Sequence, residues 1–299
     1  MKEDIQMTHY LLLSGGMDSV LLLRDLMDTL KDNPADKLLL LYVNASFTLN
    51  KQPQEIIAVE KSLKWMSEHY PNEWKRVERK VVELRFHGYP HPDIIGLQSL
   101  YWLPTIMCYI DISDDATLYT TTITTDELTI AVEEFDQCFM LLHDKALMMK
   151  RHGNNPHTFE IKHPFLNYGK GTIISLFVEQ MPELFQYAVS CEHTEKNFCG
   201  MCMKCSEIIG ASIAIISRAK EEKPEIAKFL KNFLNEKYGI QYNQIENHDP
   251  LTYDFDGFFN STTRSEKDTD ETIQAIRKYY CEKSAVQNKE PEEAEENEG

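Results

Sequence analysis

Short apolar runs alternate along the first half of the chain with longer segments in which apolar residues recur at helical spacing. The runs predict strands, several of them apolar enough to be covered on both faces as in a parallel sheet, at Thr8–Leu13, Lys37–Val43, Trp74–Phe86, Thr117–Ile123 and Glu160–Leu166. The segments between them predict helices at Asp18–Leu30, Pro53–His69, Pro92–Ile112 and Asp126–Lys150, with further helices after Lys170 and Cys205. This alternation predicts an α/β fold with a doubly wound, mostly parallel five-stranded sheet.

The chain divides into four predicted regions. Residues 1–185 carry the strand-helix alternation, and residues 186–245 form a helical region that begins with clustered cysteines. Residues 246–288 form an extension with a helix predicted over 270–285, and residues 289–299 a disordered acidic tail. Aromatic residues at the start of the extension either dock it onto the domain or form a homodimer contact: Tyr253, Phe255, Phe258 and Phe259.

A glycine pair joins the first predicted strand directly to the first predicted helix, in the string Ser14-Gly15-Gly16-Met17-Asp18-Ser19. Glycines let successive amides turn toward an anion, and the first amides of a helix have no partner within it, so the string predicts a phosphate-binding loop. The serine hydroxyls add donors, and the carboxylate of Asp18 suits a metal ion or the orientation of another group. An ordinary strand-to-helix turn with Asp18 as its N-cap is the alternative interpretation.

Other polar residues follow predicted strands at the same edge of the sheet. We expect Val43-Asn44-Ala45-Ser46 and the segment from Thr121 to Asp126 to form walls of an adenine and ribose pocket, although each could equally be a polar strand-end loop. Lys170 begins a predicted helix, where a cation is disfavoured by the helix dipole. A phosphate close to Lys170 would compensate, and a solvated surface lysine is the simpler alternative.

Four of the seven cysteines lie close together, at Cys191, Cys199, Cys202 and Cys205. Their Cx7CxxCxxC spacing predicts a structural zinc site with four thiolate ligands, and His193 within the loop could replace one of them. An iron-sulfur cluster, a redox-active CxxC pair and unpaired structural cysteines are the alternatives. Because no secretory signal is apparent, a metal is favoured over disulfides.

The charge balance narrows the classes of partner. The formal net charge of -17 would repel a nucleic-acid backbone, so nucleic acid is not expected as the direct partner. No apolar run approaches the roughly 20 residues needed to span a bilayer. We therefore expect a soluble cytoplasmic protein with no membrane association.

Two motifs in register resemble known families. The loop Ser14 to Ser19 resembles the SGGxDS signature of the PP-loop ATP pyrophosphatases, which have a HUP-like Rossmann-type fold. Together with Pro164 to Lys170, Ser190-Cys191 and the segment Cys199 to Cys205, it resembles the 7-cyano-7-deazaguanine synthase (QueC) family over roughly residues 8 to 220.

The resemblance implies an ATP-dependent carbon-nitrogen ligase that uses Mg²⁺ and Zn²⁺. Its implied substrates are 7-carboxy-7-deazaguanine and ammonia, and its product is 7-cyano-7-deazaguanine (preQ0), an intermediate of queuosine biosynthesis, with AMP and pyrophosphate released. The implied phosphate-binding residues are Ser14, Gly15, Gly16, Met17, Asp18 and Ser19. The implied catalytic residues are Asp18 and Lys170, and the implied zinc ligands are the four clustered cysteines.

The sequence departs from the family where the base would be recognised. The family's Gly-Gln-Arg-rich stretch is replaced by Val43 to Thr48, its Arg-Asn pair by Gly96 to Trp102, and its Asp-Cys-Arg-Pro segment after Asp126 is missing. Two further hypotheses therefore stay open. One is a divergent enzyme of phage or antiviral defence that attaches a deazaguanine to a protein acceptor, and the other is a degenerate scaffold that binds nucleotide or zinc.

Overall fold

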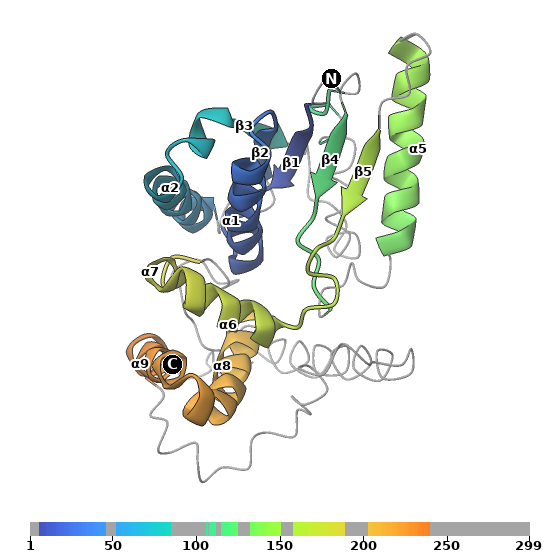
Figure 1. The fold of residues 1–299 in the computed structure, drawn as a ribbon. Helices are drawn as coiled ribbons and strands as arrows, with labels where there is room; N and C mark the ends of the chain where they lie inside the picture. The colour runs from blue at the N-terminus through green and yellow to red at the C-terminus, as the bar shows by residue number, and fades with distance from the viewer. Residues whose placement is uncertain are drawn as a thin grey trace, which may run out of the picture. The chain divides into compact units, whose positions relative to one another are not determined.

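Five parallel strands form the central sheet. The structure is a computed structural model that describes residues 6–45, 52–84, 106, 108–111, 115–124, 132–150, 158–188 and 203–239. The strands are β1 (Thr8–Leu12), β2 (Lys37–Ala45), β3 (Val77–Leu84), β4 (Ala116–Tyr119) and β5 (Phe159–Lys162). Their spatial order is β3-β2-β1-β4-β5, and every pairing is parallel (Figure 1). The predicted α/β fold with a five-stranded parallel sheet is confirmed.

The helices predicted after β1, after β2, before β5, after Lys170 and after Cys205 are confirmed with small changes of bounds. The elements of the first half are α1 (Met17–Asp32), α2 (Gln52–His69), the 3-10 turn η2 (Glu73–Arg76) and α5 (Val132–Lys150). Those of the second half are α6 (Lys170–Gln180), α7 (Pro182–Phe185), α8 (Met203–Glu222) and α9 (Pro224–Tyr238). Of these, α7 and α9 are further helices that the sequence pattern did not predict. None of the helices in the described ranges is long and apolar enough to cross a membrane.

Both faces of the sheet are covered, which explains the continuous apolar runs. Successive strand residues point to opposite faces of the sheet, so each strand must supply apolar side chains to both cores. The core on one face combines alternate strand residues with α1: Leu11, Leu13, Leu38, Leu40, Leu22 and Leu26. The core on the opposite face combines the intervening strand residues with α5: Tyr10, Leu39, Leu41, Leu118, Phe135 and Phe139.

The first core continues into the helices of the second half. Phe177 of α6, Phe185 of α7 and Phe233 of α9 belong to it, and the rings of Phe185 and Phe233 meet edge to face with centroids 4.7 Å apart. Helix α6 contacts α1, α8 and α9 (Figure 1). Helix α6 is therefore held by packing against both α1 of the sheet domain and the helices of the second half.

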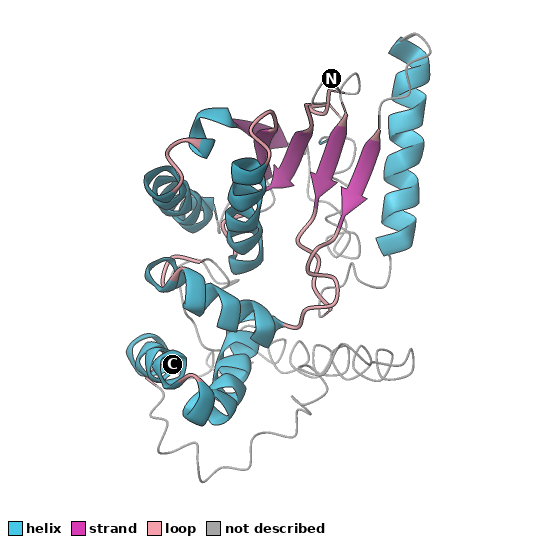
Figure 2. Ribbon diagram, in the orientation of Figure 1, coloured by secondary structure: helices cyan, strands magenta, loops and turns pink. Residues whose placement is uncertain are grey.

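Three predicted strands extend several residues beyond the observed β3, β4 and β5, each for a local reason. Before β3, Val77 N–H donates to Trp74 O, three residues earlier, and closes the 3-10 turn. Arg76 in that turn donates to the carbonyls of Leu30 (2.6 Å), Asn33 (2.9 Å) and Asp36 (2.9 Å), where the unpaired carbonyl end of α1 needs donors. The strands β4 and β5 end at Tyr119 and Lys162 because the residues that follow turn toward each other (Figure 2).

Several predictions fall outside the described residues. They are most of the helix at 92–112, the segment 126–131, three of the clustered cysteines, and the extension and tail from 246 to 299. These predictions, and the division into four regions, are untested by the structure.

Candidate functional site

The loop after β1 is fixed by a glycine that no other residue could replace without strain. Gly15 has φ +80°, in the left-handed region, and a Cβ added there would lie 3.0 Å from Ala58 Cβ and 3.1 Å from Glu55 O of α2. The sequence predicts that the glycine pair leaves its amides free to turn toward an anion. In the structure the missing Cβ makes room for α2, and the backbone is thereby held in its turn.

Two serine hydroxyls brace the same loop. Ser19 Oγ donates to Gly16 O at 3.0 Å and accepts from Ser14 N–H at 3.3 Å. Ser14 Oγ lies 3.2 Å from Ser19 Oγ and accepts from Gly16 N–H at 3.3 Å. Ser19 is only 1% exposed, whereas Ser14 is exposed. Ser14 is therefore the better placed of the two to reach a ligand, and Ser19 acts here as an internal brace.

Asp18 and Lys170, far apart in sequence, form a bidentate ion pair. Lys170 Nζ lies 3.1 Å from Asp18 Oδ1 and 3.0 Å from Oδ2, and the two side chains are 8% and 22% exposed. The interpretation of Lys170 as a solvated surface lysine is wrong. Both residues that the sequence singled out for catalysis meet at one point.

The ion pair joins the N-termini of two helices. Asp18 is in the first turn of α1 and Lys170 is the first residue of α6, and each helix is preceded by a glycine in extended conformation, Gly16 and Gly169. Neither glycine gives its helix a side-chain cap. The leading amides of both helices thus depend on the backbone turn, water or a ligand, and both dipoles favour negative charge at this place.

The meeting point lies where the sheet changes direction of winding. From β1 the chain proceeds to β2 on one side, while β4 lies on the other side of β1. In parallel sheets, ligands bind outside the carboxyl ends of the strands at such a switch point. The Gly15-Gly16 loop follows β1, and the segment from Thr120 follows β4, so the two flank this position.

A side-chain network that the sequence analysis missed lies beside it. His163, which directly follows β5, bonds through Nδ1 with Thr120 Oγ1, and its Nε2 lies 2.9 Å and 3.1 Å from the two carboxylate oxygens of Asp136 in α5. Thr120 Oγ1 also lies 3.3 Å from Thr122 Oγ1. The available signal was a lone histidine and a threonine run at two adjacent strand ends, but only the fold shows that they touch.

The other residues predicted to line the nucleotide pocket do not gather at the Asp18–Lys170 pair. The side chain of Val43 packs against the core on the α5 face of the sheet, and Met17 is 2% exposed and packs in the opposite core. Met17 could therefore meet a ligand only through its amide. Thr121 is half-buried directly after the Thr120 position, and Asp126 lies outside the described residues.

The cysteine site is represented by one of its four members. Cys205 is 0% exposed near the start of α8, while Cys191, Cys199 and Cys202 lie outside the described ranges. Within those ranges no group of three or more His, Cys, Asp or Glu side chains is placed to hold a metal. The zinc site stays a prediction.

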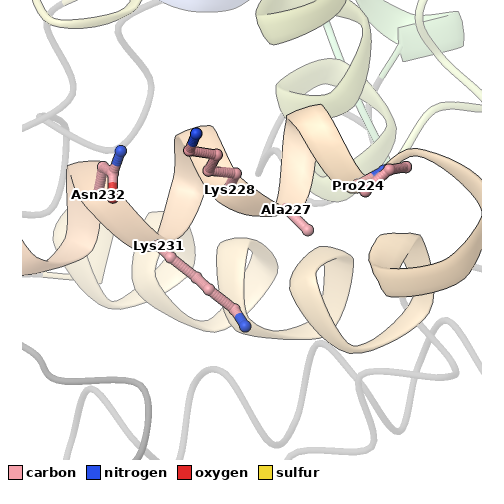
Figure 3. Close-up of a pocket in the computed structure, with 5 residues that line it drawn as sticks. All are labelled: Pro224, Ala227, Lys228, Lys231 and Asn232. Atoms are coloured by element: carbon pink, nitrogen blue, oxygen red, sulfur yellow. The ribbon is translucent and has the colours of Figure 1, made fainter.

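A surface hollow on α9 is lined by other residues than those of the candidate site. It has a volume of about 310 Å³ and is lined by Pro224, Ala227, Lys228, Lys231 and Asn232 (Figure 3). All five residues come from one helix, and the hollow contains none of the residues at the carboxyl edge of the sheet. We do not count it as part of the candidate site.

Fold and site together define an α/β protein with two helix N-termini and a buried lysine-aspartate pair at the switch point of a parallel sheet. No protein-family model matches the chain, and no curated protein matches it. Among solved structures, the chain is similar to the U34-tRNA thiolase NcsA from Methanococcus maripaludis with its [4Fe-4S] cluster. The identity is 16%, the TM-score is 0.37, and the match covers 85% of this chain and 79% of the other, a likeness too weak to support a conclusion about fold or function.

Proposed function

We propose that the chain binds the phosphates of ATP at the carboxyl end of β1 and uses ATP to adenylate a carboxylate. The observation that carries the proposal is the buried pair of Asp18 and Lys170 between two helix N-termini. A lysine at a helix start is disfavoured by the dipole, and its burial costs further free energy unless an anion is close. Asp18 supplies one anion, and a bound phosphate would supply the second.

Each group has a distinct part in the proposed site. The leading amides of α1 and the hydroxyl of Ser14 would bind the departing pyrophosphate, as helix N-termini do for anions. Lys170 would stabilise the negative charge that develops as the bond from the α-phosphorus to pyrophosphate breaks. The carboxylate of Asp18 is a suitable ligand for Mg²⁺, which when bound would neutralise the phosphates.

The substrate is proposed from the sequence resemblance. 7-Carboxy-7-deazaguanine and ammonia are the expected partners, with preQ0 as product, and Zn²⁺ in the four-cysteine site as a structural ion. A protein acceptor for the deazaguanine is the second version of the enzyme. The Asp18–Lys170 pair supports either enzyme over a degenerate scaffold, since a scaffold has no need of a buried lysine beside a phosphate loop.

The test is nucleotide turnover by the purified chain. With Mg-ATP, 7-carboxy-7-deazaguanine and ammonia, we expect AMP and pyrophosphate to appear together, and Lys170→Met to lower kcat by about 10²- to 10³-fold. Lys162→Met is the matched control, because Lys162 is half-exposed and pairs with Glu160 at 2.8 Å outside the site. The control should keep wild-type turnover.

The products separate the versions of the proposal. Free nitrile supports the synthase, and a deazaguanine mass added to a co-expressed protein supports the acceptor version. The proposal fails if folded wild-type chain releases no AMP with any carboxylate tried. It also fails if Lys170→Met and Lys162→Met turn over ATP equally.

A further inference from the structure

The ring of His163 is hydrogen-bonded through both of its nitrogens. A carboxylate accepts hydrogen bonds, so Nε2 of His163 donates to Asp136. The other nitrogen, Nδ1, bonds with the hydroxyl of Thr120. Both ring nitrogens are engaged, and the side chain of His163 is only 8% exposed. The ring is therefore held from two sides.

The network joins the segment after β4 to the segment that leads into α6. Thr120 N–H donates to Lys162 O at 3.0 Å, and the side chain of Thr120 bonds the next residue, His163. Four residues further on, Thr124 donates to Tyr168 O through both its N–H and its Oγ1, each at 3.1 Å. The two segments are thus fastened at both ends, and they cross between the strands and α6 (Figure 2).

The fastened segment ends directly before Lys170. Internal turns make it short and stiff, with Leu166 N–H donating to His163 O at 3.1 Å and Tyr168 N–H to Phe165 O at 2.8 Å. Phe165 is 3% exposed in the core, and Gly169 then caps α6. Little freedom is left between His163 and the lysine that meets Asp18.

We propose that His163 is a positioning residue for Lys170. Through Thr120 on one side and Asp136 on the other, it fixes the segment that places the Lys170 ammonium against Asp18 at the end of β1. This inference rests on the proposed function for its effect on turnover, but its structural consequence is measurable without nucleotide. His163 itself need not touch substrate.

The test removes one hydroxyl and leaves the shape of the side chain. Thr120→Val should lower kcat for AMP and pyrophosphate release about ten- to hundredfold, because a displaced catalytic group costs that much, while KM for ATP changes less than twofold. Thr120→Ser restores the hydroxyl and should recover the rate. His163→Gln, whose amide keeps a donor toward Asp136 but loses the bond to Thr120, should match Thr120→Val.

Thr158→Val is the matched control at the opposite ends of the same two strands. Thr158 Oγ1 donates to Asp115 Oδ1 at 2.7 Å before β5, so the variant also loses one hydroxyl bond that links the β4 and β5 regions. It should keep wild-type kcat. A loss equal to that of Thr120→Val would show that general stability matters, and would overturn the inference.

Hydrogen exchange without nucleotide gives a second, independent result. Thr120→Val should speed amide exchange at 163–171, and Thr158→Val should not. If the wild-type chain turns over no ATP, the proposed function fails while this arm still decides whether His163 fixes the segment. Unchanged exchange in Thr120→Val overturns the inference whatever the activity.

Discussion

Gly15 combines two separate demands at one position. Its φ of +80° disfavours any side chain, and the neighbouring helix α2 leaves no space for a Cβ. Gly239, which caps α9, also has a left-handed backbone with φ +67°, but it is not crowded, since nothing lies within 4 Å of its Cβ position. The chain therefore contains its own control for separating backbone strain from crowding.

We predict that Gly15→Ala lowers the free energy of unfolding by about 3 kcal/mol, from the left-handed backbone and the close contacts together. Gly239→Ala should cost about 1 kcal/mol, from the backbone alone. Urea denaturation of both variants measures the difference. Equal losses would mean that α2 does not crowd the loop.

At the scale of elements, a buried histidine joins β1 to the connection between α1 and β2. His9 is 5% exposed, its Nε2 lies 3.1 Å from Asp36 Oδ2, and Asp36 Oδ1 accepts from Met7 N–H at 3.0 Å. Burial lowers the pKa of His9 below its ordinary value of 6.5, although the hydrogen bond and charge of Asp36 oppose the shift. The ring is thus preferentially neutral in the folded chain.

This lowered pKa predicts a loss of stability in acid. Well above pH 6.5 the ring is neutral in both the folded and the unfolded chain and does not make stability depend on pH. As the pH falls through 6.5, the unfolded chain takes up a proton that the folded chain resists, so the free energy of unfolding falls. Urea denaturation from pH 8 to pH 5 should show a shallower fall for His9→Gln than for wild type.

At the scale of the whole molecule, helix α8 carries one of the predicted metal ligands and packs against α6, the helix that begins with Lys170. That ligand, Cys205, is buried near the start of α8. A metal bound by the four cysteines would therefore also hold α8 in place against α6. A structural zinc site contributes folding free energy, because its four ligands are brought together only in the folded chain.

Elemental analysis of the purified chain should therefore find one zinc per molecule, and Cys205→Ser should reduce the zinc content and the melting temperature. Cys138→Ser, at an exposed cysteine of α5, should change neither. Iron with visible absorbance in place of zinc would favour the cluster that the spacing also allows.

Sequence patterns were sufficient for the elements because local physics sets them. The apolar runs and the helix that begins at Lys170 follow from neighbouring residues, and the structure confirms the five strands and this helix. The bounds of the strands were predicted less well. Strands β4 and β5 end where Thr120 and His163 form a hydrogen bond, and these residues are 43 positions apart in the sequence. The residue pattern of a single segment cannot predict such a contact.

The amino-acid sequence by itself determined the α/β class, and it marked the Ser14–Ser19 loop and Lys170 as the candidate site. Only the tertiary structure decided that Lys170 is buried on Asp18, that Gly15 is needed for the packing of α2, and that His163 links two strand ends. The physical reason is the range of the interactions. Backbone turns and apolar periodicity act over a few residues, whereas ion pairs and buried hydrogen bonds depend on which distant segments the sheet brings together.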